Sequence, residues 1–156
     1  LRIPTTLPLT LYHLSFGDCF NQDISMLPST ITHLSLGYNF NQQYNIPQNI
    51  KYLKMDCNNI YIINSLPNSL LELELNVNFK LEINNLPTSI KKLIIHPYSD
   101  YDADLNCLPD FIEELQLNKN YKKRIIRIPP NLKKIICNKN YPYKDDFSHL
   151  DIEYIV

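Results

Sequence analysis

A Leu-Pro or Ile-Pro pair returns about every twenty residues along this chain. The prolines of these pairs are 20, 19, 20, 20, 22 and 20 residues apart and are Pro8, Pro28, Pro47, Pro67, Pro87, Pro109 and Pro129. Self-similarity at a fixed short period indicates a repeat architecture, in which each unit buries its apolar side only against neighbouring units. The period therefore predicts a solenoid whose coils cannot fold alone.

Three apolar columns follow these prolines. The three-place column, counted from each proline, is Leu11, Ile31, Ile50, Leu70, Ile90, Ile112 and Leu132. The six-place column is Leu14, Leu34, Leu53, Leu73, Leu93, Leu115 and Ile135, and the eight-place column is Phe16, Leu36, Met55, Leu75, Ile95, Leu117 and Cys137. The last two columns alternate with polar residues, the period of a half-buried strand, so each unit is expected to carry one short strand. The proline disfavours helix just before it, so we expect an extended or 3₁₀ return path.

Two further columns lie beyond the predicted strands. The eleven-place column is Asn39, Asn58, Asn78, Asn120 and Asn140, with Cys19 in the first unit and Tyr98 in the fifth. An asparagine amide both donates and accepts, so these residues are predicted to bind main-chain groups where the chain leaves the strand. The next place holds aromatic residues expected to fill the turn, which are Phe20, Phe40, Phe79, Tyr121 and Tyr141. The residues expected to close the back of each coil are Ile24, Tyr44, Ile63, Ile83 and Ile125.

The segments "LPLTLYHLSFGDCFNQDI" and "LPSTITHLSLGYNFNQ" resemble FNIP repeats, a leucine-rich-repeat variant of amoebae and of the giant viruses that infect them, with the form LPxSLxxLxLGxxFNxxI. The likeness extends over nearly all of residues 7 to 147 and is closest in units one, two and four. The "FN" pair is replaced by Asn59-Ile60, Tyr121-Lys122 and Tyr141-Pro142 in units three, six and seven. Such arrays often accompany an F-box or a kinase domain, so the resemblance implies recognition of a partner.

We therefore predict one β-rich solenoid over residues 1 to 156, a leucine-rich-repeat-like right-handed coil with one parallel sheet of about seven to eight short strands and little helix. The predicted units are 7–26, 27–45, 46–65, 66–85, 86–107, 108–127 and 128–149, with a terminal half-repeat at 150–156. The spacing of "LDIEYIV" places Ile152 and Ile155 in the three-place and six-place columns. Terminal coils require capping, so we expect a flanking domain or subunit at the ends, including a domain upstream of Leu1.

Residues five, seven and nine places after each proline should point outward and form a concave binding surface, here called the outward face. Its candidate contact residues are Tyr52, Lys54, Asp56, Glu74, Lys92, Ile94, His96 and Ile136. One column of this face alternates in sign and contains Glu72, Lys92, Glu114 and Lys134. These charges form either a ladder of cross-strand ion pairs or a set of contacts that orient a partner, and both readings are compatible.

The outward face also invites a chemical interpretation. His13 and His33 should stack near Asp56, but two imidazoles without a sure third ligand are a weak metal site. Ser15 and Ser35 lie beside these histidines, yet no group that orients the base or stabilises an oxyanion accompanies them. We therefore expect no metal, no cofactor and no enzymatic activity.

The fifth unit is 22 residues long and contains "YSDYDADL". Asp100, Asp102 and Asp104 alternate as in the first half of an EF-hand loop. Leu105 and Phe111 occupy the positions where that loop needs glycine and glutamate, so a solvated acidic bulge is favoured over a calcium site. Insertions in solenoids often add binding specificity, so these aspartates are candidate contacts.

Charge divides the chain. Residues 1 to 118 hold 6 Lys/Arg and 12 Asp/Glu, whereas residues 119 to 156 hold 9 and 4. A basic patch with tyrosines between its charges contains Lys122, Lys123, Arg124 and Arg127. This composition is compatible with nucleic acid or with an acidic protein surface as the partner.

The sequence contains neither a signal peptide nor an apolar run of transmembrane length, and its 4 cysteines lack zinc-site spacing. We expect an intracellular, cytoplasmic protein, in the host cytoplasm if it is viral. The predicted function is non-enzymatic protein recognition, in its finer form as the substrate-receptor arm of an F-box-type ubiquitin ligase adaptor. The alternative is a structural or nucleic-acid-associated component that binds acidic partners through its basic C-terminal end.

Overall fold

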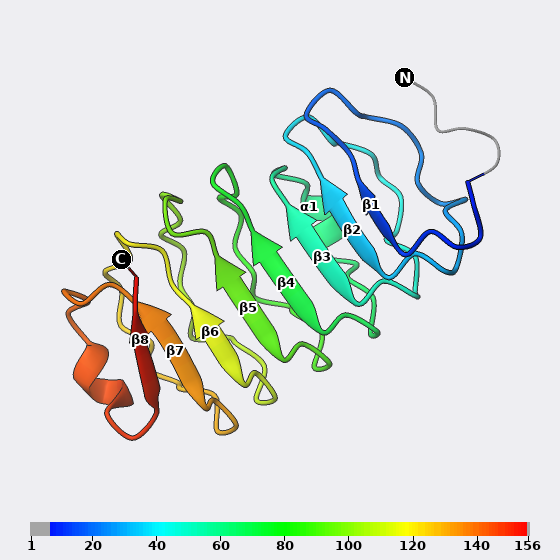
Figure 1. Cartoon of the computed structure of the whole chain (residues 1–156). Coiled ribbons are helices and arrows are strands. Elements are labelled where there is room, and N and C mark those ends of the chain that lie inside the picture. Colours follow the sequence, from blue (N-terminus) through cyan, green and yellow to red (C-terminus); the bar gives the residue numbers. More distant parts are fainter. Residues whose placement is uncertain (1–6, 156) are drawn as a thin grey trace.

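The computed structural model describes residues 7–155 and contains one parallel sheet whose eight strands follow in sequence order (Figure 1). The strands are β1 His13–Ser15, β2 His33–Leu36, β3 Tyr52–Met55, β4 Glu72–Leu75, β5 Lys92–Ile95, β6 Glu114–Gln116, β7 Lys134–Cys137 and β8 Asp151–Tyr154. Strands β1 to β7 are each followed by a return segment on the other side of the coil (Figure 1). The predicted helix-poor solenoid with one parallel sheet is confirmed.

The register of the sheet follows the columns of the sequence. Leu14 pairs with Leu34, and the six-place column then continues strand by strand to Ile135. Between β2 and β7 this column and the eight-place column are buried, since leucines of neighbouring coils cover one another. In the first coil Leu14 and Phe16 are only partly buried, because β1 is the first strand of the sheet among the described residues.

The recurrent proline makes a turn at the entry of every coil. Its carbonyl oxygen accepts a hydrogen bond from the amide three residues later. In the first coil Leu11 N donates to Pro8 O at 3.0 Å, and in the seventh Leu132 N donates to Pro129 O at 3.0 Å. A second turn leaves the strand, as in Phe40 N to Gly37 O at 3.2 Å. These two turns let about twenty residues complete a coil without a long helix.

Helical structure is limited to two short segments in the described part of the chain. The helix α1, Ile60–Ile63, occupies the return path of the third coil, where the "FN" pair is lost. Asn59 caps it, because its side-chain oxygen accepts from the Tyr61 and Ile62 amides at 3.1 and 3.3 Å. The second segment is the 3₁₀ helix η1, Lys144–Phe147, which buries Phe147. Neither helix has the length and apolarity that a bilayer crossing requires.

Two details of the predicted packing are wrong. Tyr44 is 42% exposed, and Ile46, in the next entry pair, is the buried residue at this point of the coil. Ile152 pairs with Ile135 and so lies in the six-place column, not in the three-place column. The cause is η1, which replaces a proline turn before β8, with Leu150 N donating to Phe147 O at 2.9 Å.

The eleven-place asparagines are exposed, and most of them do not form the main-chain hydrogen bonds that were predicted for them. Asn58 does bind main chain, since its amide nitrogen donates to Asn78 O at 2.8 Å and its oxygen accepts from Lys80 N at 2.6 Å. Asn78 instead donates its side-chain amide to Asp56 Oδ1 at 3.0 Å. In the described residues no side-chain hydrogen bond is formed by Asn39, Asn120 or Asn140.

Asparagines one or two places away perform the main-chain role. Asn118 is buried and donates its side-chain amide to Ser99 O at 2.6 Å. Asn138 donates in the same way to Lys119 O at 3.1 Å, and the buried Asn59 donates to Gln42 O at 2.8 Å. These bonds join each coil to the preceding one.

The aromatic column has the expected position at the turn. Phe40, Phe79, Tyr121 and Tyr141 are buried, and Phe20 in the first coil is partly buried. In the fifth coil this place is Ser99, and Tyr101, two residues later, supplies the ring. The column therefore continues through the insertion, with its ring moved along the chain.

Candidate functional site

A hollow of about 540 Å³ opens on the outward face of β1 to β4 and is here called the sheet hollow. The outward side chains that line it are His13, Ser15, His33, Ser35, Tyr52, Lys54, Glu72 and Glu74. Strands β1, β2, β3 and β4 each contribute two of them, so the site exists only when these coils are stacked.

Three stacked rings form one side of the sheet hollow. The centroids of His13 and His33 are 3.7 Å apart with an interplanar angle of 19°, and those of His33 and Tyr52 are 4.0 Å apart at 11°. This ring stack follows from the parallel register, which places residues of one column on adjacent strands. Desolvation lowers the pKa of His33, and the nearby His13 lowers it further.

Small side chains line the sheet hollow on β1 and β2, where Ser15 and Ser35 occupy the seven-place positions. Gly17 and Gly37, which do not line the hollow, follow at the nine-place positions. A Cβ at Gly37 would lie 2.6 Å from both the carbonyl carbon and the oxygen of Gly17, closer than a side chain tolerates. Glycine at Gly37 therefore permits the close approach of the first two coils.

Charged residues line the sheet hollow on β3 and β4. Lys54 Nζ lies 2.6 Å from Glu74 Oε1, so these two charges neutralise one another. Glu72 makes no side-chain hydrogen bond or ion pair in the described part of the chain. Lys92, its neighbour in the column, lies 3.1 Å from the Glu114 carboxylate instead.

The outward face of β5 to β8 differs. Ile94, Gln116 and Ile136 occupy the seven-place positions that are serines in β1 and β2. The predicted charge ladder is partly wrong, because Lys134 pairs with Glu153 of β8 at 2.6 Å instead of with Glu114. The reason is geometric: β8 brings a carboxylate diagonally opposite Lys134 that the ladder hypothesis did not include.

The predicted contact residues are thus divided between two areas. Tyr52, Lys54 and Glu74 line the sheet hollow, and Asp56 lies at the end of β3, where it accepts hydrogen bonds from Asn78. The predicted contacts on β5 to β7 or just after β5 lie outside the sheet hollow and are Lys92, Ile94, His96 and Ile136. The lining residues that were not among the predicted contacts are His13, Ser15, His33, Ser35 and Glu72. The signal in the sequence that could have identified these residues was a run of ring-bearing residues in the five-place column beside small residues in the seven-place column.

In the acidic loop of the fifth coil, exposed aspartates lie beside buried side chains, and the buried side chains hold the loop against the core. Asp100, Asp102 and Asp104 are exposed, whereas Tyr101 and Leu105 between and beside them are buried. A second hollow, of about 410 Å³, lies beside this loop and also includes Lys122 and the buried Asn118. Across residues 7–155, no group of three or more His, Cys, Asp or Glu side chains is placed to hold a metal ion.

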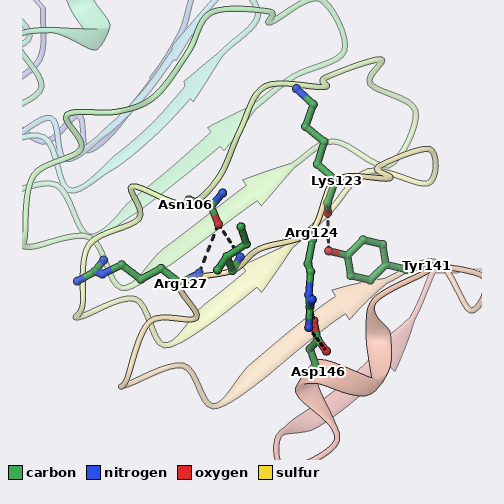
Figure 2. A network of polar contacts seen from close by, with 7 residues as sticks. Asn106, Lys123, Arg124, Arg127, Tyr141 and Asp146 are labelled. Atoms are coloured by element: carbon green, nitrogen blue, oxygen red, sulfur yellow. Dashed lines mark hydrogen bonds and ion pairs between the residues drawn. The ribbon is translucent and has the colours of Figure 1, made fainter.

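Two arginines of the basic patch pair with carboxylates of neighbouring coils, and Figure 2 shows one of these pairs, Arg124 with Asp146. Arg124 donates two hydrogen bonds to Asp146, at 2.8 and 3.2 Å, and this pairing raises the pKa of the guanidinium. Arg127 pairs with Asp110 and also donates to Leu108 O at 2.9 Å. The patch is therefore less positive than its composition indicates.

The main chain of the same segment is also engaged. Lys123 accepts at its carbonyl a hydrogen bond from the Tyr141 hydroxyl at 2.8 Å (Figure 2). Asn106 accepts from the Ile126 and Arg127 amides at 2.5 and 3.3 Å (Figure 2). Lys122 and Lys123 have exposed side chains without a carboxylate partner in the described part of the chain.

The thiols divide into two pairs. Cys57 and Cys137 are buried, and Cys19 and Cys107 are exposed. Burial raises the pKa of the Cys57 thiol to about 11, so its reactive thiolate is scarce at neutral pH.

Comparisons with known proteins agree with the repeat. The family model for the FNIP repeat matches residues 3–39, 20–58, 40–77 and 58–98. Among curated proteins, none matches the sequence. The crystal structure of CroV588, a circular leucine-rich-repeat protein of a giant virus, has a similar fold with a TM-score of 0.57 and 29% identity. The match covers 86% of this chain and 25% of CroV588, so the chain spans about a quarter of that protein's length.

Proposed function

Because the chain belongs to the FNIP-repeat family, whose model matches more than half of it, we propose that it is a protein-recognition module that binds its partner in the sheet hollow. The leucine-rich-repeat type of solenoid is typically a non-enzymatic interaction scaffold. The observation that carries the proposal is the sheet hollow itself, since side chains of four coils form one open depression. A site shared among coils is suited to a segment of protein lying across several strands.

The chemistry of the sheet hollow supports binding over catalysis. His33 uses its Nδ1 atom in a 2.9 Å hydrogen bond with Thr32, and neither Ser15 nor Ser35 is hydrogen-bonded to an imidazole within residues 7–155. Nucleophilic catalysis needs a hydroxyl joined to a base that a third group orients. Tyrosine, by contrast, is one of the residue types that most often anchor protein recognition, and Tyr52 lines the sheet hollow.

The finer proposal is that this solenoid is the substrate-receptor arm of an F-box-type ubiquitin ligase adaptor. It depends on the polypeptide that contains this chain, and the family resemblance supports it. The test is to sequence the complete reading frame and to ask whether its product co-purifies with a ubiquitin ligase core. An F-box with no recovery of ligase subunits would contradict the adaptor role and leave protein recognition intact.

The nucleic-acid alternative is weakened by the ion pairs of Arg124 and Arg127. It predicts binding that falls steeply with salt and weakens when Lys122, Lys123 and Arg124 are changed to glutamine. A fluorescence-anisotropy titration with labelled single-stranded RNA or DNA at low salt measures this directly. Absence of binding under those conditions would remove the alternative.

Selection from a random 12-residue peptide library, displayed on phage and panned against the whole chain, tests the main proposal. We expect selected peptides to lose affinity for the Ser35→Trp variant, because Ser35 lines the sheet hollow and an indole there takes up part of its volume. Gln116→Trp on β6 is the matched control, since it adds the same ring to the outward face outside the hollow. Peptides that tolerate Ser35→Trp and are blocked by Gln116→Trp would overturn the proposed location.

A further inference from the structure

We propose that the sheet hollow recognises an arginine side chain of the partner, held between the ring of Tyr52 and the carboxylate of Glu72. The inference rests on the proposed function and specifies its chemistry. It depends on three features of these strands: an uncovered ring face, an unpaired carboxylate and the sign of the surrounding charge.

The uncovered ring face belongs to the last member of the ring stack. His33 covers one face of Tyr52, with centroids 4.0 Å apart. On the other side, the next residue in the column is Glu72, which pairs in register with Tyr52. Tyr52 is 36% exposed, and among residues 7–155 no second ring and no cation lies over it. A flat cationic group can therefore extend the stack by one layer.

The unpaired carboxylate is Glu72. The two lysines nearest to it along the outward columns are already engaged, Lys54 with Glu74 at 2.6 Å and Lys92 with Glu114 at 3.1 Å. In contrast, the carboxylate of Glu72 lacks a partner in the described residues. A partner's cation that binds there replaces water at one surface carboxylate and breaks no ion pair of the solenoid.

Charge complementarity selects a cationic group. The sheet hollow contains Lys54, Glu72 and Glu74, which leaves one negative charge when both histidines are neutral. The chain from residue 1 to 118 carries 6 basic and 12 acidic residues. This field attracts a basic segment and repels an acidic one during encounter.

Arginine fits this position better than lysine does. Its planar guanidinium stacks on an aromatic face and offers parallel N–H groups to a carboxylate at the same time. The ammonium of lysine is a compact charge that satisfies the carboxylate without matching the ring.

The first test uses a small probe. N-acetyl-arginine methylamide is titrated into the whole isotope-labelled chain while the Tyr52 resonances are followed by NMR. We expect saturable shifts, with binding about ten-fold weaker for the lysine derivative and about ten-fold or more weaker for the neutral citrulline derivative. Equal shifts with arginine and citrulline would overturn the inference, because charge would then play no part.

Variants locate the contact. Glu72→Gln and Tyr52→Leu are each expected to weaken binding of the arginine probe about ten-fold. The controls are Glu82→Gln and Tyr38→Leu, which remove the same groups outside the sheet hollow and should leave binding unchanged. Thermal unfolding of each variant checks that the solenoid is intact. A folded Glu72→Gln variant with unchanged affinity would overturn the inference.

The peptide library separates this inference from the proposed function. Peptides that Ser35→Trp blocks should be enriched in arginine and should bind Glu72→Gln about ten-fold less tightly. Peptides that Ser35→Trp blocks but that contain no required arginine would overturn the arginine site and support the hollow as a binding site. Recovery of no peptide directed to the hollow would count against both.

Discussion

The first four strands and the last four share one inner face and have different outer faces. Leucine and isoleucine of the six-place column continue from β1 to β7 without interruption. On the outer side, β1 to β4 carry rings, serines and a free carboxylate, whereas β5 to β8 carry isoleucines and lysines paired with glutamates. The inner positions must fit the same neighbours in every coil, so they repeat. The outer positions have no such constraint, and the candidate binding site lies where they depart from one another.

The turn column differs between the same two regions. It contains phenylalanine in the coils of β1, β2 and β4 and tyrosine in the coils of β6 and β7. The Tyr121 hydroxyl donates to Ala103 O at 3.1 Å, and the Tyr141 hydroxyl donates to Lys123 O at 2.8 Å. The C-terminal coils are thus joined by tyrosine hydroxyl groups at this place, whereas in the N-terminal region only Asn59, in the coil of β3, donates a hydrogen bond from it, to Gln42 O at 2.8 Å.

The largest expected effect tests whether the inner face is equivalent in both regions. Leu73→Ala on β4 and Leu115→Ala on β6 each empty a fully buried site, so each should lower the free energy of unfolding by about 2 to 5 kcal/mol. Leu14→Ala on the partly buried β1 is the control and should cost less. Urea denaturation measures all three. A difference of several kcal/mol between Leu73→Ala and Leu115→Ala would break the equivalence.

The next effect concerns the close approach of the first two coils. Gly37→Ala places a methyl group 2.6 Å from the backbone of Gly17, so the coils must separate, at a cost of about 1 to 3 kcal/mol. The matched change Gly17→Ala meets no atom within 4 Å and should cost much less. Thermal unfolding compares the two. Equal costs would show that the packing distance at Gly37 does not limit stability.

A smaller effect distinguishes two tyrosines of the C-terminal region. Tyr141→Phe removes a hydrogen bond to Lys123 O and should cost about 0.5 to 1.5 kcal/mol. Tyr101→Phe removes a buried hydroxyl that has no partner in the described structure, so stability should be unchanged or higher. Urea midpoints of the two variants give the comparison. The contrast between the regions fails if Tyr141→Phe is as stable as the original chain.

The smallest effect is the titration of the ring stack. The pKa of His33 lies below its ordinary value through desolvation and through His13, so the folded chain binds fewer protons there than the unfolded chain does. The contribution of His33 to stability is therefore present above pH about 6.5 and declines as the pH falls through the lowered pKa. NMR titration of the imidazole resonances should show His33 titrating below pH about 6.5 and shifting upward in His13→Ala. An unchanged His33 pKa in His13→Ala would show that His13 does not lower the pKa of His33.

The sequence predicted the fold well because burial repeats with the period. Each apolar column needed only its spacing from the proline, and β1 to β7 begin five places after it. The errors occur where the period is interrupted. Ile152 was misplaced because η1 replaces a proline turn, and Tyr44 was chosen where the later Ile46 is buried.

The candidate site was harder to predict because it depends on which outward neighbours interact. Lys134 has three carboxylates nearby, Glu114 and Asp151 in register and Glu153 on the diagonal, and the coordinates show that it pairs with Glu153. The stack of His13 on His33 and the serines beside it could be expected from the register, but that side chains of four strands line one hollow required the coordinates. The Arg124 to Asp146 pair spans 22 residues, about one coil, so inspection of charges one period apart would have found it.

The sequential order of the sheet has a consequence for how such a molecule can change in length. Every strand between β1 and β8 pairs only with the strand before it and the strand after it in the chain. Deletion of one whole coil, such as residues 66–85, brings together β3 and β5, whose inward pairs, Leu53 with Met55 and Leu93 with Ile95, are both buried and apolar. A gene could therefore gain or lose complete coils by recombination between its own repeats, while the outward residues of the remaining coils stay unchanged.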